Sequence, residues 1–410
     1  MKDSGIEWIG EVPEEWGIKP IKHIFGAIGS GTTPDSSKVE YYDGNINWLQ
    51  SGDLYKKDYV YAVSKTITDL GYRSSASLRI YQAPFLAIAM YGASIGNLAI
   101  SKIDACVNQA VAVLKGEENI VRFAKLALEI SKTELIFAAQ GGTQPNINQV
   151  LIKNWVIPFP SEIEIKKIAD FLDKKVAQLD KVNSLLEEQI KTLEDYRKSL
   201  IYQTVTKGLD KTVPLKDSGV DWIGQIPEGW GVKSIKHIFD VIGSGTTPDS
   251  SKTEYYDGDI NWLQSGDLYK TDYVDSVSKT ITELGYLSSA SLKIYEAPFL
   301  AIAMYGASIG NLAISKIDAC VNQAVVVLKG KEDTVRFVKF GLEISKSELI
   351  FAAQGGTQPN INQVLIKNWL IPFPGEIEIR EIADFLDKKT KQINQMIAIK
   401  KEQIENINKQ

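Results

Sequence analysis

Amide, lysine, hydroxyl and tyrosine side chains gather on the glycine- and asparagine-rich loops of this sequence, and each type could make contacts with a nucleic acid. In the first half of the chain they are Thr32, Thr33, Lys38, Tyr41, Tyr42, Gln50, Lys56, Tyr91, Ser94, Asn97, Gln144, Asn146 and Asn148. In the second half they are Thr246, Thr247, Lys252, Tyr255, Tyr256, Gln264, Lys270, Tyr305, Ser308, Gln358 and Asn360. Amides read base edges and lysines neutralise phosphates. Two interpretations stay open for the glutamines, asparagines and lysines: DNA contact, or an ordinary solvated loop. For the tyrosines the alternative to DNA contact is a place in the core.

Catalytic chemistry is hard to assemble from the same sequence. The two histidines, His23 and His237, offer no Ser-His-Asp or Cys-His set and no cluster with metal-ligand spacing. The turn Gly31-Thr32-Thr33-Pro34 lacks the Gly-Lys-Ser/Thr ending of a phosphate-binding loop. Pro34-Asp35 followed by Lys38 faintly resembles a metal-dependent nuclease pattern, but the further carboxylates of that pattern are missing. We therefore expect a recognition protein with no catalytic residue and no bound metal.

The composition is that of an ordinary globular protein, with 44% hydrophobic and 24% charged residues among 410. No run reaches the ~18 apolar residues of a membrane span, and Met1 leads into a charged segment, so we expect a cytoplasmic protein. Cys106 and Cys320 occupy apolar runs, where a packing role is more natural than a reactive thiol. The net charge of −5 is unusual for a DNA-binding protein, so basic residues must gather on one face or a partner must supply charge.

The sequence contains an internal duplication. Residues 2–196 align with 216–410 at a constant shift of 214, and 148 of these 195 pairs are identical. Residues 2–160 differ from their counterparts at 27 positions, whereas 179–196 keep only three residues. A period of this length indicates a duplicated domain.

Each copy ends in a segment with apolar residues three and four apart. From Glu162 to about Thr206 the predicted seam of one long helix is Ile165, Ile168, Leu172, Leu179, Val182, Leu186, Leu193, Tyr196 and Leu200. In the second helix, from Glu376 onward, it is Ile379, Ile382, Leu386, Ile393, Met396 and Ile407. Heptad spacing makes a helix seek a partner helix. Gly208 is expected to end the first helix, whose length would be roughly 65 Å.

The part before each helix combines short strand patterns with helical ones. Residues 84–90, 98–100 and 105–114 are strand-like, and 121–139 has helical periodicity. The predicted fold class is therefore mixed α/β (α+β), with two near-identical domains. The expected domains are 1–160, 161–207 (first helix), 208–374 (connector and second domain) and 375–410 (second helix).

The chain resembles the specificity (S) subunit of type I restriction–modification systems. The resemblance rests on the lead-in Trp8–Trp16, the Gly31–Pro34 turn and the motif Gly142-Thr143-Gln144-Pro145-Asn146-Ile147. It continues with Ile157-Pro158-Phe159-Pro160 before the long helix, and with Tyr196–Ile201 through Val205–Gly208 at its end. Glu162-Ile163-Glu164 departs from the Pro-Leu and Glu-Gln that family members often show there.

This resemblance implies two target-recognition domains, each reading half of a split DNA site, and two helices packed antiparallel as a spacer. It also implies that two methyltransferase (M) subunits, which carry S-adenosylmethionine, bind this non-catalytic chain. Motor-nuclease (R) subunits that use ATP and Mg²⁺ can join them. A different class remains open: a two-fold protein scaffold that never touches DNA, which the acidic balance favours.

Because the two domains are near copies, antiparallel helices would relate them by an approximate two-fold axis. A pseudo-two-fold protein is expected to read a near-palindromic site, with half-sites about one helical turn apart. Four pairs break the likeness, each removing a cation or adding an anion in the second copy: Asn45/Asp259, Lys57/Thr271, Tyr61/Asp275 and Arg73/Leu287. If these positions line the DNA surface, the second half should bind more weakly, or the half-sites should differ at one base.

Overall fold

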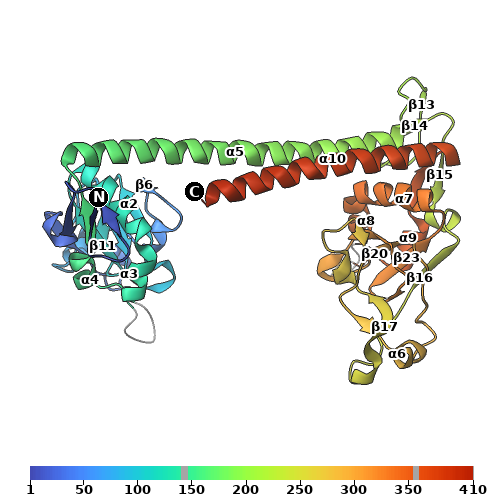
Figure 1. Cartoon of the computed structure of the whole chain (residues 1–410), viewed down its shortest axis with the longest axis horizontal. Coiled ribbons are helices and arrows are strands. Elements are labelled where there is room, and N and C mark those ends of the chain that lie inside the picture. The colour runs from blue at the N-terminus through green and yellow to red at the C-terminus, as the bar shows by residue number, and fades with distance from the viewer. Residues whose placement is uncertain (140–145, 354–359, 410) are drawn as a thin grey trace. The chain divides into compact units, whose positions relative to one another are not determined.

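The computed structural model describes residues 1–139, 146–353 and 360–409. The chain divides into two compact units, Met1–Lys181 and Val182–Gln410, and the boundary falls inside the first long helix (Figure 1). Within the described residues, no helix is both long enough and apolar enough to cross a membrane.

Unit 1 is built from short strands and a few helices. Its strands are β1 (Lys2–Asp3), β2 (Glu11–Val12), β3 (Gly17–Pro20), β4 (Ala27–Gly29), β5 (Tyr42–Leu49), β6 (Tyr59–Val60), β7 (Thr66–Ile67), β8 (Phe85–Ala89), β9 (Leu98–Ser101), β10 (Cys106–Val107), β11 (Val111–Lys115) and β12 (Val156–Phe159). Its helices are α1 (Asp69–Arg73), α2 (Glu118–Ile130), α3 (Lys132–Ala138), α4 (Gln149–Asn154) and the first part of α5 (Glu162–Lys207).

A five-stranded sheet in the order β4-β11-β8-β9-β6 forms the centre of unit 1. Its middle strand β8 is buried on both faces, which explains its continuous apolar sequence. Leu86 and Ile88 point to one face, where α2 packs, whereas Phe85, Ala87 and Ala89 point to the other, toward Leu49 and Val107. A smaller sheet, β10-β5-β7, carries α1.

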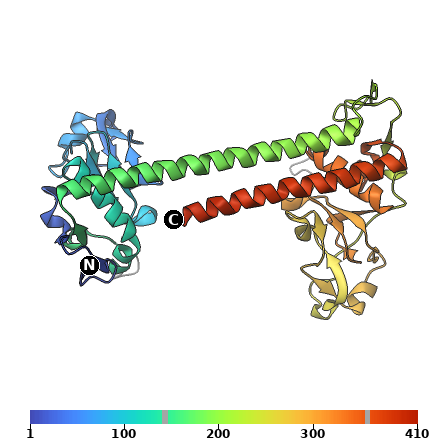
Figure 2. The ribbon, with the colours of Figure 1, turned by 45° about the horizontal axis from the view of Figure 1, so that its top comes forward.

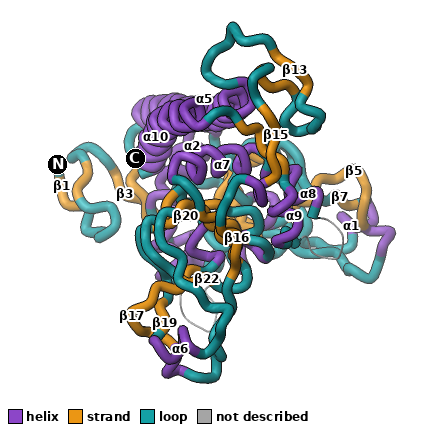
Figure 3. Tube along the Cα trace, turned by 90° about the vertical axis from the view of Figure 1, so that its right-hand side faces the viewer, coloured by secondary structure: helices purple, strands orange, loops and turns teal. Residues whose placement is uncertain are grey.

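Unit 2 repeats this architecture. Its strands are β13 (Leu215–Asp217), β14 (Gln225–Pro227), β15 (Gly231–Ser234), β16 (Val241–Ser244), β17 (Tyr256–Leu263), β18 (Tyr273–Val274), β19 (Thr280–Ile281), β20 (Phe299–Ala303), β21 (Leu312–Ser315), β22 (Cys320–Val321), β23 (Val325–Lys329) and β24 (Leu370–Phe373). Its helices are the end of α5, then α6 (Glu283–Leu287), α7 (Glu332–Ile344), α8 (Lys346–Ala352), α9 (Gln363–Asn368) and α10 (Glu376–Asn408). The five-stranded sheet has the equivalent order, β16-β23-β20-β21-β18, and Figure 3 shows α6 beside β17 and β19.

Inside unit 2 the end of α5 runs antiparallel to α10 (Figure 2). Asn183 donates to Asn408 over 2.9 Å, and Lys400 donates to Gln189. The later residue of α5 thus meets the earlier residue of α10, as an antiparallel pair requires. The predicted first helix is confirmed as Glu162–Lys207, and Gly208 follows it in the left-handed region at φ +69°.

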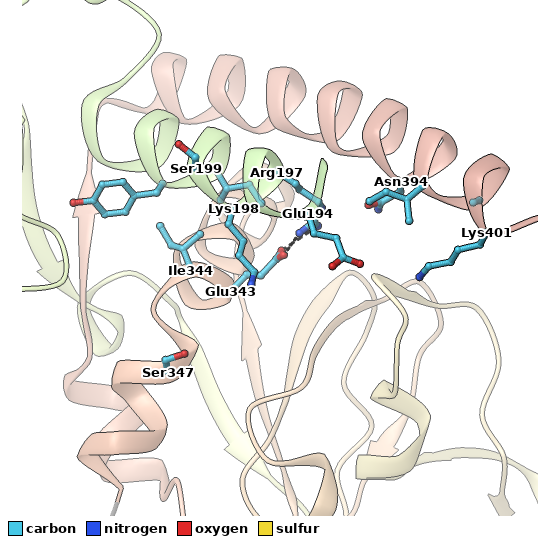
Figure 4. Close-up of a pocket in the computed structure, with 13 residues that line it drawn as sticks. Glu194, Arg197, Lys198, Ser199, Glu343, Ile344, Ser347, Asn394 and Lys401 are labelled. Atoms are coloured by element: carbon cyan, nitrogen blue, oxygen red, sulfur yellow. Dashed lines mark hydrogen bonds and ion pairs between the residues drawn. The ribbon is translucent and has the colours of Figure 1, made fainter. Parts of the chain in front are cut away.

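The predicted helix seam is wrong in part. Val182, Tyr196 and Met396 are exposed, with 43%, 55% and 49% of their surface accessible. The other predicted positions of this stretch, Leu186, Leu193 and Leu200 in α5 and Ile393 in α10, are half-buried or buried as expected. Asn183, Ile190 and Arg197 in α5 and Thr390 and Ile397 in α10 also face inward, although the seam did not include them. Of these, Ile190 lies four residues after Leu186 and Arg197 four residues after Leu193, and both are half-buried. Figure 4 shows Arg197 beside Glu343 of α7, its ion-pair partner.

Two other expectations need adjustment. The strand-like run 105–114 is two strands, β10 and β11, separated by a turn at residues 108–110, because β10 pairs with β5 and β11 pairs with β8. The helical run 121–139 is two helices, α2 and α3, which meet at Ser131. The strands expected at 84–90 and 98–100 are confirmed as β8 and β9.

Candidate nucleic-acid interface

The turn Gly31–Pro34 is held in place by three aromatic side chains beneath it. Tyr81 donates its hydroxyl to the Ser30 carbonyl (3.1 Å), Trp48 donates its indole N–H to the Thr32 carbonyl (3.3 Å), and Tyr42 donates to the Pro34 carbonyl (2.7 Å). A Cβ at Gly31 would lie 1.8 Å from the Val107 carbonyl oxygen, so glycine alone fits there. The turn is therefore a fixed platform for Thr32 and Thr33.

Thr33 points to a residue from another strand connection. Its hydroxyl donates to the side-chain oxygen of Gln109 over 2.6 Å, and both side chains are exposed. Thr247 and Gln323 make the same bond at the same distance in unit 2. Because the hydroxyl occupies the Gln109 oxygen, the amide NH₂ of Gln109 is oriented as a donor toward solvent.

Strand ends bring further loops to this turn. β5 and β10 run parallel with Leu49 opposite Val107, so Gln50 and Asn108 leave the sheet side by side. The Asn108 N–H donates to the Leu49 carbonyl, and the Met90 N–H donates to the Ala110 carbonyl, which brings Tyr91 next to residues 108–110. Ile147 donates to the Met90 carbonyl and so brings Asn146 to the same edge. Four loops distant in the sequence thus form one surface, which we call the loop edge: 30–38, 50–57, 91–97 and 108–110, with Asn146.

Two lysines lie on the first two of these loops. Lys38 donates to the Tyr41 hydroxyl (3.1 Å) and lies 5.1 Å from the Tyr41 ring centre; the hydrogen bond raises the pKa of Lys38. Lys56 lies 5.4 Å from the Tyr55 ring centre and has φ +53°, an uncommon backbone conformation for a residue other than glycine. Lys252 and Lys270 repeat both arrangements in unit 2. Aromatic support holds both ammonium groups at the surface, where a phosphate could bind.

The remaining candidates fall into three groups. Ser94 belongs to the turn Gly92–Ser94, which contacts the turn Ser51–Leu54 that follows Gln50, and Tyr91 is half-buried against the core. Asn97 accepts a hydrogen bond from Lys132, and Asn148 caps α4 by accepting from the Leu151 N–H, so both already have structural roles. Gln144 and Gln358 lie outside the described residues. In unit 2, Gln264, Tyr305, Ser308 and Asn360 take the places of Gln50, Tyr91, Ser94 and Asn146.

The carboxylates near the loop edge have structural partners. Asp53, which is buried, accepts from the Gln50 and Ser64 N–H groups. Asp35 accepts from the Ser37 side chain and N–H, which lowers the pKa of its carboxyl group. In the part of the chain that the structure describes, no group of three or more His, Cys, Asp or Glu could hold a metal ion. The predicted packing role of the cysteines is confirmed: both thiols are fully buried, and burial raises the pKa of Cys106 to about 12.

Gln109 and Gln323, which the structure brings beside the threonine turns, were not among the candidates predicted from the sequence. Asn108-Gln109 interrupts a run that is otherwise apolar, and this interruption is the signal that could have found them. The pairing with Thr33 was not readable, because it depends on which strands are neighbours in the sheets.

Comparison with known proteins places these features in a family. A family model described as the type I restriction modification DNA specificity domain matches residues 13–194 and again 227–406. The MjaIX type I restriction enzyme specificity subunit of Methanocaldococcus jannaschii is 27% identical over 386 residues, covering 89% of this chain and 84% of its own. The putative MjaX specificity subunit of the same organism is 25% identical and covers 98% of this chain and 92% of its own.

Solved structures share the fold. A chain from a study of complex assembly and conformational transition of the type I R-M system has a TM-score of 0.73 at 16% identity, with 97% of this chain and 96% of that chain covered. The HsdS subunit from Thermoanaerobacter tengcongensis has a TM-score of 0.60, also at 16% identity, with the same coverage of both chains.

Proposed function

This chain belongs to the family of type I restriction-modification DNA specificity domains, and we propose that it is the subunit that reads a split, near-palindromic DNA site. In this proposal the loop edge of each unit reads one half-site. The chain is a non-catalytic specificity subunit, so chemistry on the DNA belongs to its partners.

The observation that carries the proposal is the duplication of the loop edge. The Thr33–Gln109 bond, the three aromatic supports of the turn and both lysine–tyrosine contacts recur in unit 2 with the same residue types. These side chains are identical in the two units and make the same contacts, so they present the same donors and acceptors. Two such surfaces are expected to select the same base pattern.

The half-sites are expected to be inverted relative to each other. Antiparallel pairing of α5 and α10 would make like residues of the two copies two-fold related, and two-fold proteins read inverted repeats. Half-sites about one helical turn apart, roughly 34 Å, are the expectation for such a reader.

The partners follow from the same proposal. Two methyltransferase subunits, which carry S-adenosylmethionine, bind the chain, and motor-nuclease subunits that use ATP and Mg²⁺ can join the complex. The complex acts on double-stranded DNA in the cytoplasm. Basic residues of the partners would offset the net charge of −5, because phosphate neutralisation supplies much of the affinity for DNA.

Selection from a random duplex library tests this function. The chain is assembled with the methyltransferase subunit encoded beside it, and bound duplexes are sequenced over several rounds. We expect enrichment of two like, inverted half-sites with a fixed gap. A Gln109→Ala/Gln323→Ala double variant, which removes both amides, should relax the selected sequence while the complex still assembles.

The alternative function is a protein scaffold that does not bind DNA, and the acidic net charge is the observation that favours it. The same selection distinguishes the two functions. If the assembled complex enriches no sequence, and binds random duplexes no better than a non-binding control protein does, the DNA-reading proposal is wrong and the scaffold is preferred.

A further inference from the structure

Two adjacent amide side chains follow β10 at the loop edge, and hydrogen bonds within unit 1 fix the orientation of both. The side-chain oxygen of Asn108 accepts the N–H of Ala110 over 3.1 Å. Because a backbone N–H can only donate, the oxygen is the atom of the Asn108 amide that faces the turn, and the NH₂ group lies on the other side. Asn322 and Ala324 form the same bond, also over 3.1 Å, in unit 2.

The orientation of Gln109 follows from the bond that it shares with Thr33. The threonine Oγ1 lies 2.6 Å from the Gln109 amide. This separation is typical of an O–H···O bond and is shorter than an N–H···O bond usually is, so the threonine hydroxyl donates to the amide oxygen. The NH₂ group of Gln109 is therefore the outward end. Thr247 and Gln323 repeat the bond at the same distance in unit 2.

The two amides thus offer donors to a ligand and turn their acceptors toward the protein. Gln109 is exposed and Asn108 is half-buried, and neither NH₂ group has a hydrogen-bond partner within the residues that the structure describes. The lysines of the loop edge also only donate. The carboxylates of Asp35 and Asp53, in contrast, already accept hydrogen bonds from neighbouring N–H groups.

A surface of donors complements guanine in the major groove. Guanine presents two neighbouring acceptors there, N7 and O6, whereas adenine presents N7 beside an N6 donor and cytosine presents an N4 donor. The bidentate pairing of glutamine or asparagine with adenine needs an outward oxygen as well as an outward NH₂ group. Asn108 and Gln109 lack that outward oxygen. Adenine or cytosine would place one donor against another and leave both without a partner.

We propose that Asn108 and Gln109 in unit 1, and Asn322 and Gln323 in unit 2, select guanine and reject adenine in each half-site. This inference rests on the proposed function, because it concerns a base within the DNA that the loop edge reads. It adds the chemical class of that base: one that presents two acceptors, N7 and O6, to the amide NH₂ groups. The same pair of amides in both units makes guanine a required base of both half-sites.

Exchange of the outward group for one of the same size tests the proposal. Gln109→Glu keeps the bond from Thr33 on one carboxylate oxygen and turns the other oxygen outward as an acceptor. In a selection from random duplexes with the assembled complex, one position of one half-site should then change from guanine to cytosine, whose N4 donates. Gln323→Glu is the matched variant and should change the like position of the other half-site. Gln178→Glu, at an exposed glutamine of α5, adds the same charge and should change no base.

Base analogues provide a second measurement in which the protein stays unchanged. Each enriched guanine is replaced in turn by 7-deazaguanine, which lacks the N7 acceptor, and at least one replacement in each half-site should weaken binding about fivefold or more. Inosine at the same position keeps N7 and O6 and lacks only the minor-groove amino group, so it should bind as guanine does. In an Asn108→Ala/Gln109→Ala variant, 7-deazaguanine and guanine should bind equally in the half-site that unit 1 reads.

The outcomes distinguish this inference from the proposed function. If the wild-type complex enriches no sequence, both are wrong. If it enriches a split site, but Gln109→Glu alters no position or alters one that holds a base other than guanine, the assignment of guanine is overturned while the DNA-reading function stands. Binding that 7-deazaguanine leaves unchanged at every enriched guanine would overturn it in the same way.

Discussion

The hydrogen bond between Thr33 and Gln109 is the feature of single residues that most directly concerns recognition. It fixes which end of the Gln109 amide faces solvent, and it joins two loops separated by more than seventy residues. The sequence predicted Thr33 from its place in a glycine-rich turn, but Gln109 was recognisable only after the strand order was known. Several aromatic candidates also support the backbone: the Tyr42 hydroxyl, for example, is engaged by Pro34.

Removing the threonine hydroxyl should therefore loosen the reading of one half-site. Thr33→Val keeps the shape but frees the Gln109 amide to rotate, and we expect a loss of about 1–3 kcal/mol in discrimination at the base it contacts. The measurement is the dissociation constant of the assembled complex for duplexes that carry single base changes in either half-site. Thr247→Val is the matched control and should affect the other half-site. Equal loss at every base pair would contradict a role in reading.

Lys38 should act on affinity without changing sequence preference. Its ammonium group is exposed and held by Tyr41. In the proposed interface Lys38→Ala would remove one phosphate contact. We expect weaker binding to all duplexes. The slope of the logarithm of the binding constant against the logarithm of the salt concentration should become shallower by about one unit. Titrations at several salt concentrations measure this slope. Lys19→Ala, which removes an exposed lysine over Phe159 outside the loop edge, should leave it unchanged.

At the scale of elements, the sequence predicted the helices better than the contacts between them. Heptad spacing and Gly208 located α5 to within a residue, because helix periodicity and a left-handed end are local properties. The face that turns inward is a tertiary property. Both Met396 and Ile397 fit an apolar seam beside Ile393, and only packing decides between them.

Substitutions at two adjacent positions of α10 distinguish the predicted seam, which contains Met396, from the observed one, which contains Ile397. Ile397 is 8% exposed. Ile397→Ala should lower the free energy of unfolding by about 2–3 kcal/mol, because the buried contacts of the isoleucine are lost. Met396→Ala should change the stability by less than about 0.5 kcal/mol. The stability of each variant is measured by denaturant unfolding, and hydrogen exchange in α10 is measured as a second readout. A larger loss for Met396→Ala would show that the sequence-derived seam is the correct one.

An ion cluster at the base of α7 gives unit 2 a dependence on acid. Asp272 pairs with Lys339, which also reaches Glu343. Burial acts to raise the pKa of the Asp272 carboxyl, but the charge and hydrogen bond of Lys339 outweigh it and hold that pKa below its usual value of 3.8. A carboxyl group with a lowered pKa in the folded state stabilises the fold above its unfolded pKa. This contribution is lost as the pH falls through the folded pKa.

We therefore expect the stability of unit 2 to fall as the pH drops from about 5 to about 3. Asp272→Asn should lower stability at neutral pH and flatten the change in that window. Hydrogen exchange of β20 at each pH reports on unit 2 alone. Asp275→Asn, at a surface carboxylate paired with Lys316, is the control and should keep the wild-type pH profile. If Asp272→Asn kept the wild-type dependence of stability on pH, the Asp272–Lys339 pair would not be its cause.

At the scale of the whole molecule, the duplication was fully readable from the sequence, and the two units repeat each other strand for strand. What the sequence could not predict is how single differences change local pairing. Lys102 pairs with Glu118 in unit 1, whereas its counterpart Lys316 pairs with Asp275, which replaces Tyr61. That substitution redirects a lysine and adds an anion, so it could make the two half-sites unequal.

The central claim is that two near-identical units read a near-palindromic site. Its most direct test is to express the chain with its neighbouring methyltransferase in a host, and to map methylated adenines across the genome by long-read sequencing. We predict an interrupted palindrome, methylated once on each strand, with differences confined to a base near the four charge-changing positions. Two unrelated half-sites, or no methylation by an assembled complex that binds S-adenosylmethionine, would contradict the claim.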